Sequence, residues 1–148
     1  MSANYKQLAE FQKKIEKLND QQKEQFLESC CKELAARLLA KVIKNSGPEK
    51  FKNSTGNFRR GWTGGKNQNA AAYANSLSIK HIGNKYQIDI INPVEYASYI
   101  EYGHRTRDHK GWVPGHFILT IAEQELNSMS DAILQKKLNK FMKDVFGK

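Results

Sequence analysis

The sequence feature that most constrains the fold is an alternation of residue types on both sides of Gly83–Asn84. Apolar or aromatic side chains stand at every second position there: Leu77, Ile79 and His81 before the pair, and Tyr86, Ile88 and Ile90 after it. Successive side chains of a β-strand point to opposite faces, and a two-residue turn places His81 opposite Tyr86 and Ile79 opposite Ile88. Because this register puts both series on one face, residues 76–91 are predicted to form an antiparallel hairpin.

Helical periodicity precedes the hairpin. Residues 3–18 carry an apolar stripe at helical spacing, formed by Tyr5, Leu8, Phe11, Ile15 and Leu18. A second helix is predicted from Asp20 to the NSGP segment at 45–48, with one apolar side formed by Leu27, Cys30, Leu34, Leu38 and Val42. Adjacent helical positions point in different directions, so Cys30 and Cys31 are interpreted as buried helix residues without a mutual disulfide.

The segments around the hairpin have different patterns. Residues 47–74 are rich in Gly, Asn and Lys without sustained periodicity, which predicts an extended loop with one helical turn around Asn57–Trp62. Pro93 ends the second strand, because proline cannot donate a hydrogen bond to the ladder. After Phe117 the spacing is helical again, with a break predicted at Asn127–Asp131. A final helix is then striped by Leu134, Leu138, Phe141 and Val145.

This order of elements indicates an α+β fold, a small antiparallel sheet with N-terminal helices and C-terminal helices packed around it. We expect a single domain over residues 1–148. Its expected parts are N-terminal helices (1–46), an extended loop (47–74), the β-hairpin (75–92), a connector (93–116) and C-terminal helices (117–148).

The charge balance is strongly basic. Twenty-four Lys and Arg against 15 Asp and Glu give a formal charge of +9 with neutral histidines. Such a charge favours acidic partners, which include nucleic acid, an anionic protein ring and a membrane surface. No apolar run approaches the about 20 residues that span a bilayer, and the first residues lack the apolar core of a signal peptide. We therefore expect a cytosolic chain without membrane contact.

The connector admits a catalytic interpretation. Glu95 and Glu101 could form a carboxylate pair, with His104, His109 and His116 as bases or metal ligands. The histidines are five and seven positions apart, with Gly and Pro between them, which matches neither helical nor short-loop zinc spacing. The sequence also has no P-loop, no nucleophile elbow and no Cys-x-x-Cys pair. No catalysis, metal or cofactor is therefore expected here.

A contact surface fits the connector better. Tyr99, Tyr102 and Trp112 offer large rigid side chains with one polar group each, a type enriched at interface centres. Arg105 and Arg107 can pair with carboxylates of another chain.

The backbone and the flanking aromatics support this interpretation. Gly103 permits a backbone turn that other residues resist, while Tyr96 and Phe117 are expected to anchor the connector to the sheet. In the alternative, Tyr96, Ala97 and Ile100 stand at helical spacing and the cluster simply covers the sheet.

Two segments resemble a known family. The run YASYIEYG at 96–103, followed after a polar loop by Gly115-His116-Phe117 and a helix, resembles the signature of phage head-to-tail joining proteins. These are also called tail-completion, neck or tail-terminator proteins. The run TGNFRRGW at 55–62 is similar to that family's Thr-Gly-x-Leu-Arg-x-x-Trp segment. The matched segments span residues 55–122, and the order of elements agrees with the family.

The resemblance implies a structural virion protein without enzymatic activity, which joins the head connector to the tail or caps the tail's upper end. Its implied partners are further copies of itself in a hexameric or dodecameric ring, and adjacent neck, tail-tube or sheath proteins. The positive charge could also face DNA that crosses the ring lumen, through phosphate attraction that reads no sequence. The implied location is a virion or tail-like particle assembled in the bacterial cytoplasm.

A closed ring repeats one contact between two different patches of the same chain. The basic segment at 50–66 and the connector are the candidate patches. The expected interface residues are Tyr99, Glu101, Tyr102, Gly103, Arg105, Arg107, Trp112, Arg59, Arg60 and Trp62.

Three alternatives stay open at this point. A sequence-independent nucleic-acid-binding protein would explain the charge of +9, and its affinity would fall steeply with salt. A tail-like bacteriocin or a domesticated prophage particle would use the same subunit without a head. A hydrolase built on Glu95, Glu101 and the connector histidines ranks last.

Overall fold

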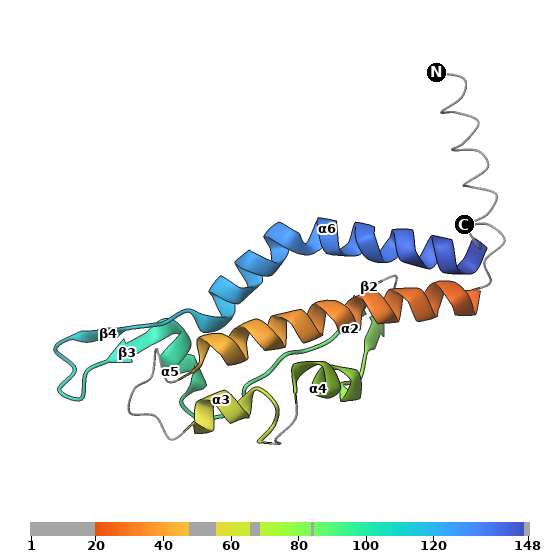
Figure 1. The fold of residues 1–148 in the computed structure, drawn as a ribbon. Helices are drawn as coiled ribbons and strands as arrows, with labels where there is room; N and C mark the ends of the chain where they lie inside the picture. The colour runs from red at the N-terminus through yellow and green to blue at the C-terminus, as the bar shows by residue number, and fades with distance from the viewer. Residues whose placement is uncertain (1–19, 48–55, 66–68, 84, 147–148) are drawn as a thin grey trace.

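A computed structural model describes residues 20–47, 56–65, 69–83 and 85–146 (Figure 1). The helix predicted at 3–18, Asn84 of the predicted turn and parts of the predicted loop lie outside the described residues. The described helices and strands are α2 (Asp20–Asn45), α3 (Asn57–Gly61), α4 (Ala70–Ser76), β1 (Lys80–Ile82), β2 (Lys85–Gln87), α5 (Ala97–Tyr102), β3 (Gly103–Arg105), β4 (Trp112–Pro114) and α6 (Ile118–Phe146).

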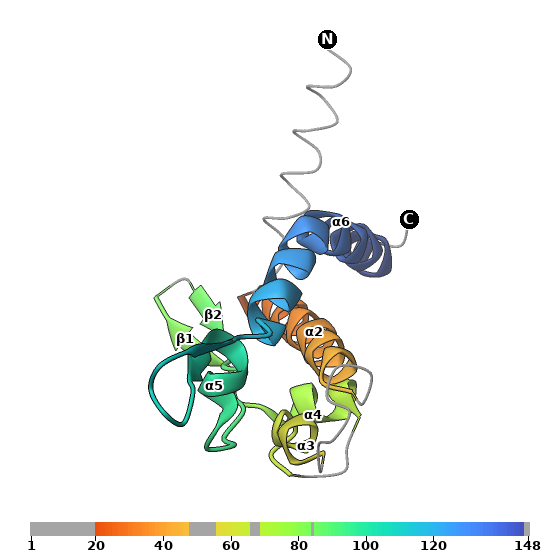
Figure 2. The ribbon, with the colours of Figure 1, turned by 90° about the vertical axis from the view of Figure 1, so that its left-hand side faces the viewer.

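The α+β class is confirmed. The helices are accompanied by two small antiparallel sheets, each of two strands, with β1 paired to β2 and β3 paired to β4. Helix α2 lies between α6 on one side and α3 with α4 on the other, as both ribbon views show (Figures 1 and 2). Within the described ranges, no helix combines the length and apolar character that a bilayer span requires.

The bounds of α2 match the prediction, and its buried face matches in part. The buried residues are Ala35, Leu39 and Val42. Of the predicted stripe, Val42 is buried and Leu38 packs partly buried against the core, whereas Leu27 is 44% exposed. The small side chain of Ala35 shares the core with Ala74 of α4. Helices pack on two sides of α2, so the apolar stripe alone did not identify the side that is best covered.

The core joins elements from both ends of the chain. Its buried members come from α2, α3 and its C-terminal edge, α4 and α6: Ala35, Leu39, Val42, Phe58, Trp62, Ala74, Ile118 and Ala122. Cys30 and Cys31 are partly buried free thiols, and burial raises the pKa of both.

The β1–β2 hairpin has the predicted register but shorter strands. His81 pairs with Tyr86, flanked by Lys80 opposite Gln87 and Ile82 opposite Lys85. The predicted pair Ile79–Ile88 lies beyond this ladder. Ile88 and Ile90 instead leave the strand and pack, partly buried, against the core, because burying these side chains gains more than extending an exposed two-stranded ribbon.

The predicted extended loop contains two helices. The helical turn expected around Asn57–Trp62 is present as α3, but α4 was not predicted. The Asn69 side chain caps α4 by accepting a hydrogen bond from the Ala72 backbone N–H at 2.7 Å, and the alanines that follow are strong helix formers. An Asn before an alanine run was the signal that could have identified α4.

The break predicted at Asn127–Asp131 is wrong, since α6 runs continuously from Ile118 to Phe146. Figure 1 shows that this helix bends along its length. The hydroxyls of Ser128 and Ser130 donate to the carbonyl oxygens of Glu125 and Asn127 at 2.7 and 3.1 Å. Such bonds to the preceding turn are a known cause of helix bending, so the predicted break corresponds to serines that bend the helix without ending it.

Candidate contact surface

The connector contains a second hairpin that projects beyond the helices at one end of the molecule (Figure 1). Strands β3 and β4 pair antiparallel, with His104 opposite Val113 and Arg105 opposite Trp112. In the loop between them, the Thr106 backbone N–H donates to the Gly111 carbonyl at 3.0 Å. The Thr106 hydroxyl donates to Asp108 at 2.6 Å and accepts from the Gly111 N–H at 3.0 Å. The loop is therefore ordered by its own polar groups.

Asp108 remains charged within this loop. The hydrogen bond from the Thr106 hydroxyl, with one from the Lys110 N–H, lowers the pKa of the Asp108 carboxyl. Its charge is surrounded in sequence by Arg105, Arg107 and Lys110, which are all exposed. The tip of the hairpin is consequently basic, with one acid held in place by the turn.

Two glycines, Gly103 and Gly115, allow the two backbone segments at the base of this hairpin to lie very close together. Gly103 has φ +89° and ψ 178°, a conformation that essentially only glycine adopts. A Cβ at this position would also collide with the Val113 carbonyl oxygen, and a Cβ at Gly115 would collide with the Glu101 carbonyl oxygen. Gly103 is thus buried and structural, and it sets the path of the hairpin.

Glu101 is buried at the base of the hairpin, with 7% of its surface exposed. Its carboxylate accepts hydrogen bonds from the backbone N–H groups of Leu119 and Thr120 at 2.8 and 2.9 Å, and from the Thr120 hydroxyl at 2.7 Å. These donors belong to the first turn of α6, where N–H groups lack helical partners and a negative charge is favoured. Glu101 therefore joins α5 to α6, while Glu95 is exposed.

Three aromatic side chains of the connector are more than half exposed, so they do not belong to the core. Tyr99 is 59% exposed, Tyr102 63% and Trp112 59%. Tyr99 lies against the His104 ring at a centroid distance of 5.5 Å, and Tyr102 meets Phe117 edge to face at 6.4 Å. Tyr96 and Phe117, which were expected to anchor the connector, are also exposed. In the alternative, Tyr96, Ala97 and Ile100 were covering residues; of these, Ala97 and Ile100 pack partly buried against the core, whereas Tyr96 is 42% exposed.

The upstream segment at 55–62 has both exposed and buried residues. Arg59 and Arg60 are exposed on α3, and Arg60 donates to Asn57 at 2.5 Å. Trp62 is only 4% exposed, meets Phe58 edge to face, and donates its indole N–H to the Ser46 hydroxyl at 3.0 Å.

The expected interface residues therefore fall into three groups. Trp62, Glu101 and Gly103 are buried inside the subunit, so they support the surface without forming it. We use the name contact surface for the candidate residues Tyr99, Tyr102, Arg105, Arg107 and Trp112, all of which are exposed. Arg59 and Arg60 form a separate exposed basic pair on α3.

The connector histidines do not act as a unit in the structure. His104 shares a hydrogen bond with the Arg105 carbonyl oxygen at 2.8 Å, and His109 sits in the exposed loop with φ +60°. Among the described residues, the one group of potential metal ligands is elsewhere and consists of Glu24, Glu28 and His81. Sequence reasoning did not find it because its members come from elements far apart in the chain; the spacing of Glu24 and Glu28 by one helical turn was the available signal.

Comparison with known proteins identifies one family. A family model described as "HK97-gp10_like: Bacteriophage HK97-gp10, putative tail-component" matches residues 9–103. No curated protein and no solved structure shows a significant match. The matched region ends inside the connector, at the first residue of β3.

Proposed function

This chain belongs to the HK97-gp10-like family of phage tail components, and from that premise we propose that it forms a homo-oligomeric ring at the head-proximal end of the tail. In this role it joins the head connector to the tail or terminates the tail tube, as a hexamer or dodecamer. It acts through contacts with copies of itself and with adjacent neck, tube or sheath proteins. We further propose that it is structural and has no catalytic activity.

The observation that supports this proposal is the contact surface. Its three aromatics are each more than half exposed, and two arginines accompany them on a hairpin whose loop is ordered by internal hydrogen bonds. Tyr, Trp and Arg are the residues that dominate binding energy at protein interfaces. A preorganised hairpin loses little conformational entropy when it docks. The family match gives no support to the alternative of a sequence-independent nucleic-acid binder.

A ring requires a second patch that differs from the first. We propose that Arg59 and Arg60 on α3 belong to it, because both are exposed and neither lies on the projecting hairpin (Figure 1). The contact is then heterologous, with the hairpin of one subunit docking near α3 of the next.

The test is mass photometry of the full chain, combined with negative-stain imaging. Tyr102→Ala and Arg105→Ala should leave the circular dichroism spectrum unchanged and abolish ring formation, because truncating such a residue costs about 2 kcal/mol, roughly thirtyfold in affinity at each contact. Ile82→Ala is the matched control, since Ile82 is 58% exposed on the other hairpin; it should assemble normally. Normal rings from Tyr102→Ala and Arg105→Ala would overturn the assignment of this surface.

Mixing variants distinguishes a heterologous ring from other assemblies. Tyr102→Ala retains an intact α3 patch, and Arg59→Ala retains an intact hairpin; alanine is chosen because a glutamate at position 59 would attract the basic tip of the hairpin. An equimolar mixture should give dimers and no rings, because each mixed pair can form one intact contact and cannot propagate it. A mixture that gives rings would show that the two patches do not meet one another.

A further inference from the structure

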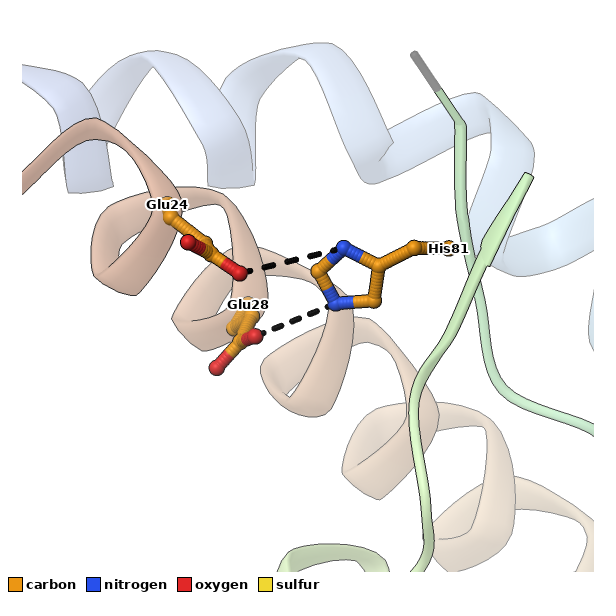
Figure 3. A group of neighbouring side chains, drawn as sticks. All are labelled: Glu24, Glu28 and His81. Atoms are coloured by element: carbon orange, nitrogen blue, oxygen red, sulfur yellow. Dashed lines mark hydrogen bonds and ion pairs between the residues drawn. The ribbon is translucent and has the colours of Figure 1, made fainter. Parts of the chain in front are cut away.

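Three potential metal ligands converge where the first hairpin meets α2 (Figure 3). Glu24 and Glu28 are one helical turn apart on α2 and therefore share a face, and His81 reaches them from β1. His81 Nε2 lies 3.2 Å from Glu28 Oε1, and His81 Nδ1 lies 3.9 Å from Glu24 Oε1. The ring is thus placed between two carboxylates, with one nitrogen toward each.

The negative charge of Glu24 and Glu28 is not balanced by a lysine or arginine among the described residues. Within the described residues, the ion pairs of Glu24 and Glu28 involve no Lys or Arg and go only to His81. By contrast, Glu33, Glu125 and Asp89 each pair with a lysine. Two carboxylates that face one imidazole remain net negative whether the ring is neutral or protonated, although the whole chain carries +9. Such a group attracts a cation.

We propose that Glu28 and His81 Nε2 bind a divalent transition-metal ion, with Zn²⁺ as the model ion, and that Glu24 positions the imidazole. Zinc lies about 2.0–2.1 Å from imidazole nitrogen and carboxylate oxygen, so two tetrahedral ligands are about 3.3 Å apart. His81 Nε2 and Glu28 Oε1 share a hydrogen bond at 3.2 Å in this structure, and this separation is close to that of two ligands of one ion, which would replace the bonding proton. All three side chains are partly exposed, which leaves water free to complete the coordination.

Glu24 faces the other ring nitrogen of His81, Nδ1. A metal-bound histidine commonly donates the N–H of its second nitrogen to a carboxylate in this position. The negative charge of Glu24 also adds to the attraction for the ion. The bound metal would link β1 to α2 through ligands that are 53 positions apart in the sequence. This proposal does not depend on the ring of subunits proposed above. The metal needs a neutral imidazole, so its binding competes with protonation of His81.

The test is isothermal titration of the full chain with ZnCl₂ at neutral pH, after treatment with a chelator. We expect one ion per chain and an affinity lowered about tenfold or more by His81→Ala or Glu28→Gln, with a smaller loss in Glu24→Gln. His109→Ala is the matched control, because His109 is an exposed histidine outside the group; its affinity should equal that of the unmodified chain.

Thermal unfolding gives an independent measurement. Zn²⁺ should raise the melting temperature of the unmodified chain and of His109→Ala, because a ligand that binds only the folded state stabilises it. It should not do so for His81→Ala. The proposal is overturned by the absence of binding at millimolar Zn²⁺, or by binding that survives both His81→Ala and Glu28→Gln.

Discussion

At the scale of single residues, Glu101 shows how a side chain of the proposed contact segment can lie beneath its surface. From sequence it was an expected interface residue and, in the lowest-ranked alternative, one of a catalytic pair. The structure buries its carboxylate against three donors of α6. A short local pattern could not reveal this role, because the donors lie 18 and 19 positions away.

Glu101→Ala is expected to lower the free energy of unfolding by about 2 kcal/mol, because it removes a charged helix cap and leaves buried N–H donors unpaired. Glu101→Gln retains an acceptor and should cost less. The measurement is urea unfolding followed by circular dichroism, at equal protein concentrations.

Glu95→Ala is the matched control for this prediction. Glu95 is an exposed glutamate of the same connector, and its removal should change stability by no more than about 0.5 kcal/mol. Equal losses from the two alanine variants would show that the three hydrogen bonds to α6 contribute nothing specific.

At the scale of elements, α2 and α6 are joined by a charged network. Glu33 of α2 accepts from Lys137 of α6 at 2.9 Å and from Arg37 at 3.4 Å. The hydrogen bond from Lys137 lowers the pKa of Glu33 below its ordinary value of 4.5. Because the pKa is lower in the folded state, the stabilisation is present above the unfolded-state value and disappears as the pH falls through the folded-state value.

Lys137→Met should therefore lower stability at neutral pH by up to about 1 kcal/mol, the usual range for a partly exposed ion pair. The difference from the unmodified chain should shrink in acid, once Glu33 is protonated in both states. Urea unfolding at neutral and acidic pH measures both values. Lys136→Met is the control, since Lys136 is exposed on the same helix; a pH-dependent loss in that variant would contradict the assignment to Glu33.

Periodicity predicted some elements well and others poorly, for identifiable reasons. The limits of α2 and the register of His81 with Tyr86 depend on local patterns, and both were predictable. The buried face of α2 depends on which helices cover it, and the length of β1 depends on Ile88 and Ile90 reaching the core. The β3–β4 hairpin was missed because its strands are short and exposed, without alternating apolar residues.

The exposure of the connector side chains was predictable from residue type, but the residues that support them were not. Tyr102, Arg105 and Trp112 are exposed, whereas Trp62 is buried and donates a hydrogen bond to Ser46, 16 positions earlier. Convergence of Glu28 with His81 likewise requires the three-dimensional fold. Contacts between distant segments are the information that a single sequence pattern lacks.

At the scale of the whole molecule, α2 is the element that the rest share. It contacts α4 and α6, the contact surface lies beyond its C-terminal end, and the first hairpin lies near its N-terminal half (Figure 1). The expected single domain should therefore unfold as one unit, because losing α2 would uncover the core on both sides.

The two tryptophans allow this to be measured. Trp62 is 4% exposed and Trp112 is 59% exposed, so a Trp112→Phe variant reports the core through Trp62 alone. Its fluorescence transition in urea should coincide with the loss of helix by circular dichroism. Fluorescence that changes at a lower urea concentration would show that α3 and its neighbours separate from the long helices first.

The glycine crossing at Gly103 and Gly115 also bears on how such a subunit can diverge between hosts. Side chains are excluded where the two arms of the hairpin meet, yet Arg107, Asp108, His109 and Lys110 at the tip are all exposed. Substitutions and insertions at the tip thus leave the base of the hairpin unstrained. In the role proposed above, a lineage can change the charge and reach of this hairpin within a few mutations while the base that orients it stays the same, so the preference for a partner can evolve faster than the fold.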